Sequence, residues 1–359
     1  MRVCCIVETV YQLINAMNLA INYKELSSAY IDLFIRKNHF ANEEYYLSKI
    51  EKKNVFSDIK VFSFRDYSGS NLINHLRHIP ETMYAADIIS RACGNDYRFM
   101  SREYDVILTP NCCHFFKLAM ICCTKAEVWC FEDGALSYGG FNWIESEVSL
   151  LSKKVLKFTG QYRKLLPSRV YLYNPKLFES TWRTEVHTIP SLKDEMSSAT
   201  FHEIFGRPDC DYSGVKVVFL SQPSPVSESR TSEITDQIKC SFISRYHPRN
   251  NQDFHLNGMI DHSSSQWELI CAESITDDHV LIGAGSSAQT SPKWLFGKEP
   301  YLIFTYPLYE GIGQRFIDTC EAIVSKTKSM YRNPEKVMVV WSIEELNDSI
   351  QKAMSNTIC

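Results

Sequence analysis

The chain has no run of the roughly 18 uncharged apolar residues that a membrane-spanning helix requires. It also lacks the pattern of a secretion signal, because Arg2 precedes only a short apolar segment that ends at Glu8 and no small-residue cleavage site follows. The formal net charge is −4, so the positive balance of a non-specific nucleic-acid-binding protein is missing as well. These absences predict a soluble, cytoplasmic protein that has no nucleic acid as a partner.

A disulfide framework is another feature that the sequence does not support. The 13 cysteines form an odd number, and most of them lie inside apolar segments. Three pairs are adjacent in the sequence, namely Cys4-Cys5, Cys112-Cys113 and Cys122-Cys123. This placement is typical of reduced thiols that pack as small hydrophobic side chains, and it favours a reducing compartment.

Length and composition indicate two globular domains. A chain of 359 residues with 45% hydrophobic and 22% charged residues is too long for one small core and too apolar to be disordered. In the first half, short apolar runs alternate with segments of helical spacing, which predicts a parallel sheet covered by helices on both faces. The predicted strands are Val3–Val7, Tyr30–Ile35, Ile59–Phe64, Val106–Leu108 and Val128–Phe131, and the predicted helices are Tyr11–Asn22, Glu43–Lys52, Ile79–Cys93 and His114–Cys123.

The second half repeats this alternation. The polar segment Ser191–Thr200 is the best boundary candidate, so we expect a domain at residues 1–190, a connector at 191–214 and a domain at 215–359. Two α/β halves joined in this way suggest a cleft between them, where ligands usually bind. The predicted strands are Val215–Leu220, Cys240–Ile243, Trp267–Cys271, Val280–Ile282, Tyr301–Phe304 and Lys336–Val340, and the predicted helices are Thr231–Ile238, Phe316–Lys326 and Ile343–Met354.

The segment Leu150–Lys176 carries seven basic side chains and no acidic one, with leucines between them. Two interpretations stay open. The segment is either a solvated basic helix whose apolar side packs on its domain, or a surface that contacts anionic lipid. The second interpretation predicts a peripheral protein at the inner face of the plasma membrane.

Three polar motifs each follow an apolar run, which is where open α/β sheets place their ligand sites. The first is Glu132-Asp133-Gly134, in which the glycine allows a tight turn. Adjacent side chains of an extended chain point in different directions, so one carboxylate is expected to face the ligand. Asp133 lies nearer the turn and is our candidate general base, with Glu132 and Gly134 as substrate contacts. A solvated turn is the alternative.

The second motif is His247-Pro248, flanked by Arg245 and Arg249. Pro248 keeps His247 in an extended conformation, which gives its imidazole a fixed direction. An imidazole that titrates near neutrality can donate a proton or a charge-assisted hydrogen bond to a departing phosphate. The flanking arginines would add positive potential. A purely structural histidine is the alternative.

The third motif, Gly283-Ala284-Gly285-Ser286-Ser287, ends the apolar run before it. Gly283 and Gly285 would let the backbone approach a phosphate, and the hydroxyls of Ser286 and Ser287 would bind its oxygens. The spacing is neither that of a Walker loop nor that of a dinucleotide fingerprint. We expect Pro292 to limit any helix that begins at Ser286. A strand-to-helix turn with serine caps is the alternative.

Two further motifs are weaker. Ser221-Gln222-Pro223 ends the first strand of the second half and is a candidate for binding a base or a sugar hydroxyl. Asp209-Cys210-Asp211 has the Asp-x-Asp pattern of many metal-dependent sugar transferases, but it lies in the connector and not after an apolar strand. We therefore interpret it as a turn.

In their order along the chain, Glu132-Asp133-Gly134, Ser221-Gln222-Pro223, His247-Pro248 and Ser286-Ser287 resemble the motifs of bacterial sialyltransferases, most closely the lipooligosaccharide sialyltransferases of glycosyltransferase family 52. A strand followed by a helix with Gln12-Leu13 is also similar to that family. The resemblance extends over most of the chain, although each motif is short. It implies an α/β fold of the GT-B class: two Rossmann-like domains, the first binding the acceptor and the second mainly the nucleotide.

The resemblance also implies a reaction. Asp133 would deprotonate the acceptor hydroxyl, His247 would stabilise or protonate the departing CMP phosphate, and Ser286 and Ser287 would bind that phosphate. CMP-sialic acid has a single phosphate, so hydroxyl, amide and imidazole donors can neutralise the leaving charge without a metal or another cofactor. Attack from the opposite face would invert the anomeric centre. The acceptor that the resemblance implies is a galactoside hydroxyl in a bacterial surface glycan such as lipooligosaccharide or capsule, lipid-linked or not. A homodimer is left open.

Three other functions stay open. A transferase with a UDP-sugar donor would use the same strand ends. An isomerase or hydrolase of a nucleotide sugar with a similar fold would direct the carboxylate at a ring proton or a water. A non-catalytic glycan-binding protein fits least, because it has no use for all three polar strand ends.

Overall fold

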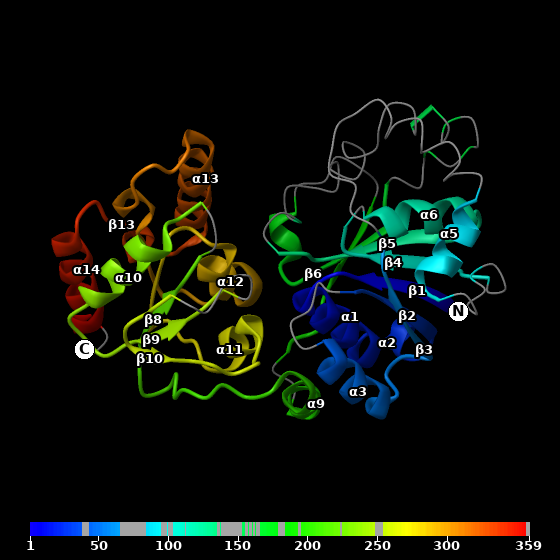
Figure 1. Ribbon diagram of the computed structural model, residues 1–359, viewed down its shortest axis with the longest axis horizontal. Helices are drawn as coiled ribbons and strands as arrows, with labels where there is room; N and C mark the ends of the chain where they lie inside the picture. The colour runs from blue at the N-terminus through cyan, green and yellow to red at the C-terminus, as the bar shows by residue number, and fades with distance from the viewer. Residues whose placement is uncertain are drawn as a thin grey trace. The chain divides into compact units, whose positions relative to one another are not determined.

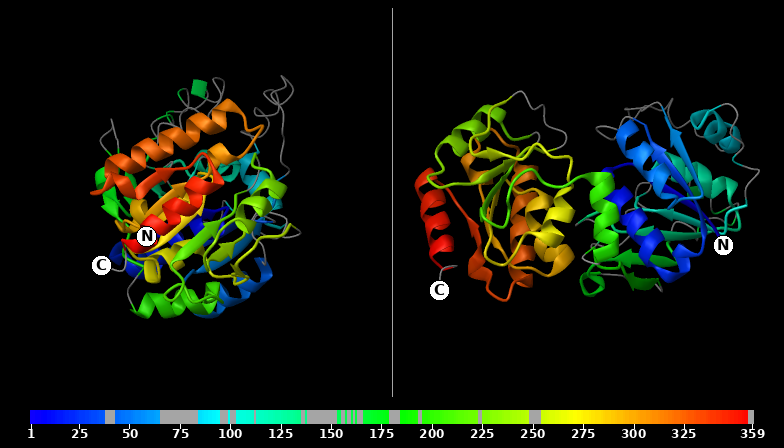
Figure 2. Two further views of the ribbon diagram at one scale, coloured as in Figure 1. Left: turned by 90° about the vertical axis from the view of Figure 1, so that its left-hand side faces the viewer. Right: turned by 90° about the horizontal axis from the view of Figure 1, so that it is seen from below.

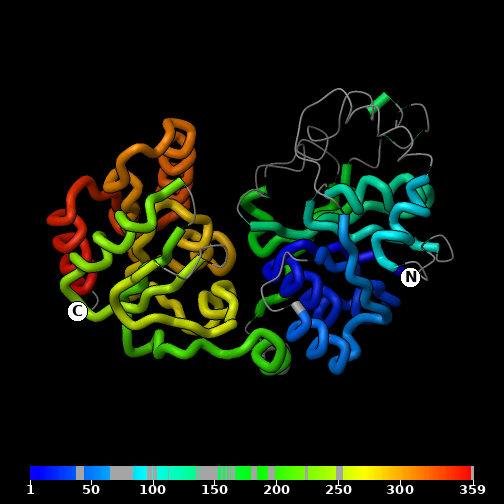
Figure 3. The backbone as a smooth tube through the Cα atoms, viewed as in Figure 1, coloured from blue at the N-terminus to red at the C-terminus, as the bar shows by residue number. Residues whose placement is uncertain are grey.

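The structure is a computed structural model in which the chain forms two compact units, Met1–Ile204 and Phe205–Cys359. The division falls inside the range 191–214 that we expected to connect two domains. Figure 3 traces the path of the chain through each unit. The residues that the structure describes are 1–37, 43–64, 84–94, 99, 103–111, 113–134, 137, 153–154, 157, 160, 162, 166–178, 184–192, 195–222, 225–247 and 254–356.

Within its described residues, the first unit contains a sheet of seven strands in the order β3-β2-β1-β4-β5-β6-β7. Every neighbouring pair is parallel. The order changes direction between β1 and β4, so this sheet has a topological switch point there. The strands are β1 Arg2–Val7, β2 Tyr30–Arg36, β3 Asp58–Phe62, β4 Val106–Thr109, β5 Glu127–Phe131, β6 Arg169–Leu172 and β7 Glu185–Thr188.

Helices cover both faces of this sheet. Figure 1 shows α1, α2 and α3 on one side and α5 and α6 on the other. The helices are α1 Val10–Asn22, α2 Lys24–Ser27, α3 Glu43–Lys53, α5 Ala85–Ala92, α6 His114–Cys122 and, at the boundary, α9 Glu195–Phe205. The predicted strands and helices of the first half are confirmed, apart from residues 79–83, which lie outside the described residues. The strands β6 and β7 and the helix α9 were not expected.

The second unit contains a second parallel sheet, in the order β10-β9-β8-β11-β12-β13. Its switch point lies between β8 and β11. The strands are β8 Val217–Leu220, β9 Ile243–Arg245, β10 Met259–Ile260, β11 Val280–Gly283, β12 Tyr301–Phe304 and β13 Val337–Val339. The helices are α10 Glu228–Asp236, α11 Trp267–Glu273, α12 Ser287–Phe296, α13 Gln314–Met330 and α14 Ile343–Ser355, and the short 3-10 helices are η4 Pro175–Leu177 in the first unit and η5 Tyr306–Leu308 and η6 Pro334–Lys336 in the second.

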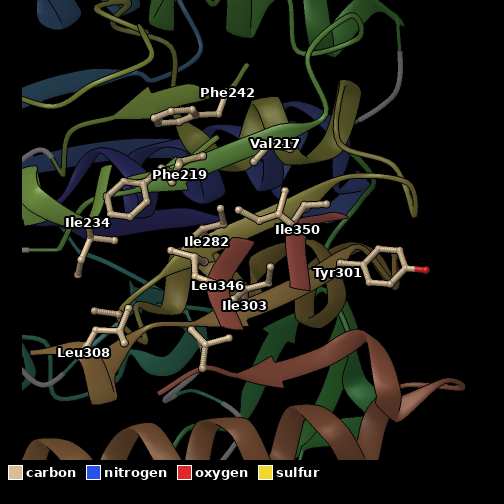
Figure 4. Close-up of a cluster of buried hydrophobic side chains, with 14 of the residues drawn as sticks. Val217, Phe219, Ile234, Phe242, Ile282, Tyr301, Ile303, Leu308, Leu346 and Ile350 are labelled. Carbon is tan, nitrogen blue, oxygen red and sulfur yellow. The ribbon is translucent and has the colours of Figure 1, made fainter. Parts of the chain in front are cut away.

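Alternate residues of these strands enter two cores, as the side-chain period of a strand requires. Phe219 on β8, Ile282 on β11 and Ile303 on β12 lie in one cluster with residues of α10 and α14, and Figure 4 shows this cluster. Residues of the opposite register, such as Leu281 and Leu302, pack against α11 and α13. In Figure 2, α13 (orange) and α14 (red) can be followed on the two sides of the sheet. The chain thus has two Rossmann-like α/β domains, and the expected α/β class with two such domains is confirmed.

One predicted strand of the second half is wrong. Trp267–Cys271 belongs to the helix α11 and not to a strand. A five-residue stretch with four apolar residues fits either structure, and periodicity cannot separate a strand from a helix at this length. In the structure Trp267, Ile270 and Cys271 share one helix face, at the spacing i, i+3 and i+4, and are buried in the core of the second unit.

The expectation that Pro292 limits the helix beyond Ser286 is also wrong, because α12 continues through Pro292 to Phe296. A proline has no N–H, so the carbonyl of Ala288, four residues earlier, loses its helical hydrogen bond. Trp267 Nε1 donates to that carbonyl at 2.6 Å. A side chain of α11 therefore replaces the missing bond, and the helix does not need to end.

The basic segment 150–176 is described only in part, because residues 150–152, 155–156, 158–159, 161 and 163–165 lie outside the described residues. Its described end includes β6, so the segment is not one continuous helix. Arg169 lies on β6 and pairs with Glu25 at 2.6 Å and with Glu185 at 3.0 Å, so this cation is neutralised by acids from elsewhere in the chain. Among the described residues, no helix combines the length and the apolar character of a membrane span. Lipid contact through this segment stays a prediction.

The buried core of the second unit gives a stability test. Ile303 on β12 is 0% exposed, so Ile303→Ala removes buried methyl groups and leaves a cavity. We expect the free energy of unfolding to fall by about 2–5 kcal/mol. Urea unfolding measures this loss, with Met259→Ala as the control because Met259 is 45% exposed. Equal losses in the two variants would contradict the description of this core.

Candidate functional site

The two carboxylates at the end of β5 have different environments. Glu132 is 0% exposed. Its carboxylate accepts hydrogen bonds from the Tyr11 hydroxyl at 2.8 Å and from the backbone N–H of Tyr173 at 3.0 Å. The side chain predicted as a substrate contact therefore fastens α1 and the chain after β6 to the end of β5. This is a structural position for Glu132.

Asp133 is only half-buried, which leaves part of it open to solvent. The Gln12 amide nitrogen donates to its Oδ1 at 2.8 Å, and the Asp133 backbone N–H donates to Ser137 Oγ at 2.8 Å. The next residue, Gly134, has a φ of +86°, so the tight turn that the sequence predicted is present. Of the two acids, Asp133 is the one placed to meet a ligand.

Three further polar residues at this edge of the sheet escaped the sequence analysis. Glu8 follows β1 and binds Arg36, at the end of β2, with 2.9 Å between Glu8 Oε1 and Arg36 Nη1. Its other oxygen accepts from Asn111 Nδ2, after β4, at 3.3 Å. Glu8 ends an apolar run, as Glu132 does, so the criterion that identified Glu132 would also have identified Glu8.

In the second unit, two of the predicted motifs lie together. The backbone N–H of His247, after β9, donates to Ser221 Oγ at 2.7 Å, and the N–H of Ser221, after β8, donates to the Arg245 carbonyl at 3.0 Å. Gln222 Oε1 is buried and has no hydrogen-bond partner among the described residues. Pro223, Pro248 and Arg249 lie outside the described residues.

Arg245 has a different role from the one expected of it. Its guanidinium pairs with the buried Asp261 and also donates to the Ser265 carbonyl. The Tyr212 hydroxyl donates to the same carboxylate at 2.6 Å. Burial alone would raise the pKa of the Asp261 carboxyl, but the Arg245 charge and hydrogen bonds from Ser263 and Tyr212 hold that pKa below its ordinary value. The charge of Arg245 is therefore compensated within the protein.

The glycine-serine segment forms the start of α12, at the switch point between β8 and β11. Ser286 is the N-cap, and its Oγ accepts from the Ala288 N–H at 3.0 Å, so the predicted serine cap is present. Ser287 is exposed in the first helical turn. Gly283 is buried at the end of β11, where an added Cβ would lie 3.1 Å from Gln289 Oε1.

Replacement of Gly285 by any other residue would strain the backbone. Its φ is +120°, and an added Cβ would lie 2.5 Å from Cys320 Sγ. Burial raises the pKa of the Cys320 thiol to about 11. The thiol is therefore protonated at neutral pH, and it donates to the Ala284 carbonyl at 3.4 Å. This packing fixes the backbone just before the helix N-terminus.

The described residues contain no group of three or more His, Cys, Asp or Glu side chains that could hold a metal. Asp209-Cys210-Asp211 is a turn, as expected: Asp211 Oδ1 accepts from the Ser213 N–H at 2.9 Å. The described cysteines are free thiols. The groups available for chemistry are thus Asp133 in the first unit and, in the second, His247 with the start of α12.

No protein-family model and no curated protein matches the sequence. Solved structures match over 99% of this chain. LpCGTa in complex with UDP is 11% identical, with 90% of that chain covered and a TM-score of 0.49. UGT2 of Phytolacca americana, complexed with UDP-2fluoro-glucose and pterostilbene, is 9% identical, with 93% covered and a TM-score of 0.49. The spinosyn rhamnosyltransferase SpnG is 11% identical, with 92% covered and a TM-score of 0.46. These likenesses concern the fold alone.

Two expectations need correction. The assignment to the family 52 sialyltransferases is wrong, and so is CMP-sialic acid as the partner: no family model matches, and the similar structures are named as complexes with UDP or a UDP-sugar analogue and as a rhamnosyltransferase. The physical reason lies in the motifs. An acid and a phosphate-binding turn at the carboxyl ends of parallel strands serve any nucleotide-sugar chemistry, so they do not specify the donor.

The buried pair of Arg245 and Asp261 predicts a pH-dependent loss of stability. Asp261→Asn should lower the free energy of unfolding at pH 7 by about 3–5 kcal/mol, because it leaves Arg245 uncompensated. The folded-state pKa of Asp261 is depressed. Its contribution is therefore present above the ordinary aspartate pKa of about 3.9 and is lost as the pH falls through the lower folded value.

Urea unfolding at stepped pH measures this effect. The difference between wild type and Asp261→Asn should stay constant above about pH 4 and shrink below it. Asp348→Asn is the control, since Asp348 is exposed on α14. A difference that is small at pH 7, or that does not change in acid, would show that the pair has no such role.

Proposed function

We propose that the protein is a glycosyltransferase that uses a nucleoside diphosphate sugar as its donor. The second unit would bind the donor and the first would supply the base that activates the acceptor hydroxyl. The observation that carries the proposal is the start of α12 at the switch point between β8 and β11, preceded by Gly285 in a conformation that only glycine adopts readily. Open α/β sheets bind ligands outside the carboxyl ends of their strands at such switch points.

The chemistry of α12 fits a phosphorylated ligand. A helix of ten residues directs its first N–H groups and the positive end of its dipole out of its N-terminus. Phosphate groups bind at such ends. Ser287 adds an exposed hydroxyl in the first turn, and the loop of Ser221 and His247 lies at the neighbouring strand β8. These groups support a nucleotide phosphate as the ligand of the second unit.

The first unit supports transfer to a hydroxyl. In the proposed reaction, Asp133 takes the proton of the acceptor hydroxyl, and the oxygen attacks the anomeric carbon of the donor sugar. The bond from that carbon to the phosphate oxygen breaks, and its electron pair leaves with the nucleoside diphosphate. The start of α12 and the imidazole of His247 stabilise the charge that develops on the leaving phosphate. Attack opposite to the leaving group inverts the anomeric centre.

The donor class proposed here is that of LpCGTa and of UGT2 of Phytolacca americana, whose structures are named as complexes with UDP or a UDP-sugar analogue. Their likeness contributes the fold, and the donor rests on the phosphate argument for α12. Sialyl transfer is not part of the proposal. The acceptor is proposed as a sugar hydroxyl, without a defined linkage.

Replacement of the base tests this function. Asp133→Asn keeps the size of the side chain and removes the proton acceptor, so transfer of labelled sugar should slow by roughly 10²–10⁴-fold. Nucleotide affinity should stay the same, because the proposed nucleotide site lies in the second unit. Asp87→Asn is the control, since Asp87 is exposed on α5. Turnover of Asp133→Asn within a few-fold of wild type would remove Asp133 from the reaction.

A second variant tests the phosphate site without any need for turnover. Ser286→Ala should weaken UDP binding in calorimetry by about 5–10-fold, as the loss of a hydrogen-bonding hydroxyl at the site costs about 1 kcal/mol. Ser342→Ala is the matched control, because Ser342 caps α14 in the same way, with its Oγ accepting from the Glu345 N–H at 3.1 Å, beyond the edge strand β13. Equal UDP affinity in both variants would place the phosphate elsewhere.

A further inference from the structure

Gln12 on α1 has a buried side-chain amide whose oxygen and nitrogen both form hydrogen bonds. It is 1% exposed. Its Oε1 accepts from the Glu8 backbone N–H at 2.6 Å, and its Nε2 donates to Asp133 Oδ1 at 2.8 Å. If the amide were turned over, its NH₂ would face a second donor and its oxygen would face a carboxylate. The backbone of Glu8 therefore fixes which end of Gln12 meets Asp133.

Two neighbours of Gln12 on α1 hold the same loop. The Tyr11 hydroxyl donates to the Glu132 carboxylate, and Asn15 Nδ2 donates to the Glu132 carbonyl at 3.0 Å. Asn15 Oδ1 in turn accepts from the Tyr173 hydroxyl at 2.9 Å. Residue 15 is a neighbour of residue 11 (i, i+4) and of residue 12 (i, i+3) on the helix surface. One side of α1 thus fixes both the main chain and the two carboxylates after β5.

We propose that Gln12 is a positioning residue that aims the Asp133 carboxylate at the acceptor hydroxyl and keeps it ionised. This inference rests on the proposed function, in which Asp133 is the general base. An amide N–H that donates to a carboxylate stabilises its charged form. A base must be ionised before it can take a proton, and its direction must be fixed before the reacting atoms can align.

The neighbouring carboxylate gives such a donor a clear function. The buried Glu132 is adjacent in sequence and, when ionised, opposes a second negative charge at Asp133. Among the described residues, the titratable groups that hydrogen bonds link to this region are the hydroxyls of Tyr11 and Tyr173, which both bond to protein groups, and the ion pair of Glu8 with Arg36. The donor that the structure places directly on the Asp133 carboxylate from α1 is the Gln12 amide.

Two replacements of Gln12 by side chains of similar size distinguish its effect on the orientation of the Asp133 carboxylate from its effect on the ionisation of that carboxylate. Gln12→Met removes the donor and keeps the volume. The acid limb of the transfer rate against pH should move to higher pH by about one unit, and kcat should fall about ten-fold with the KM for the donor unchanged. Gln12→Glu places a second carboxylate against Asp133, so that the two share a proton and the acid limb should move further than in Gln12→Met.

The control is Ser27→Asp, which adds one negative charge on the exposed surface of α2. Helix α1 extends about 15 Å beyond Gln12, which exceeds the screening length of about 8–10 Å at physiological salt. This variant should leave the pH profile and kcat as in the wild type. Recovery also discriminates, because Gln12→Glu should regain activity at high pH up to the level of Gln12→Met, which also lacks the donor, whereas a merely structural loss would show no such pH dependence.

A readout without turnover separates this inference from the proposed function. In protein labelled with ¹³C-carboxyl aspartate, the Asp133 signal, assigned through Asp133→Asn, should titrate at higher pH in Gln12→Met than in the wild type. An unchanged titration together with an unchanged acid limb would overturn the role of Gln12. A wild type that transfers no sugar while the Asp133 titration still depends on Gln12 would overturn the proposed function and leave the positioning contact intact.

Discussion

A carboxylate without access to water must receive hydrogen bonds from the protein, and Glu132 at the end of β5 is in this position. The Tyr11 hydroxyl and the backbone N–H of Tyr173 supply those bonds, so one buried charge ties α1, β5 and the chain after β6 together. These hydrogen bonds of Glu132 also fix the position of the half-buried Asp133, because Asp133 is the next residue along the chain. The two adjacent acids therefore have different roles: Glu132 holds the loop after β5, and Asp133 is partly open to solvent.

In the second unit, a buried charge near the end of a strand is stabilised by an ion pair. Arg245 at the end of β9 is bound to Asp261 after β10, which also accepts from Tyr212. The pair compensates both charges and fixes the end of β9, from which His247 and its bond to Ser221 follow. The start of α12 is fixed by packing instead, since Gly285 fits closely against Cys320. In both units, buried side-chain contacts thus fix the backbone next to the residues that are proposed to meet the ligands.

Much of the fold could be predicted from the sequence because buried parallel strands appear as apolar runs, and the order of strands and helices then follows. Trp267–Cys271 shows the limit of that rule: four apolar residues in a stretch of five do not reveal whether their period is that of a strand or of a helix. Pro292 shows another limit, since the Trp267 indole that replaces the missing helical bond lies 21 positions before its acceptor, Ala288.

The positions of the motifs were predictable, but the partners of their side chains were not. Strand ends located Asp133, Ser221 and Ser286, while the partners of Glu132, Arg245 and Gln12 come from other strands and helices that only the fold brings close. The same reasoning explains the error over the family. Polar residues at strand ends follow from the sheet topology, so a match in their order indicates a fold and a kind of chemistry but no particular nucleotide.

The most direct test of the account is a donor panel with the intact wild-type protein. Labelled UDP-, dTDP- and CMP-linked sugars are each incubated with a set of glycoside acceptors, and both the labelled product and the released nucleotide are measured. The account predicts transfer from a diphosphate-linked sugar, with nucleoside diphosphate released only when an acceptor is present. No transfer from any diphosphate-linked sugar, or release of free sugar at the same rate without an acceptor, would contradict it.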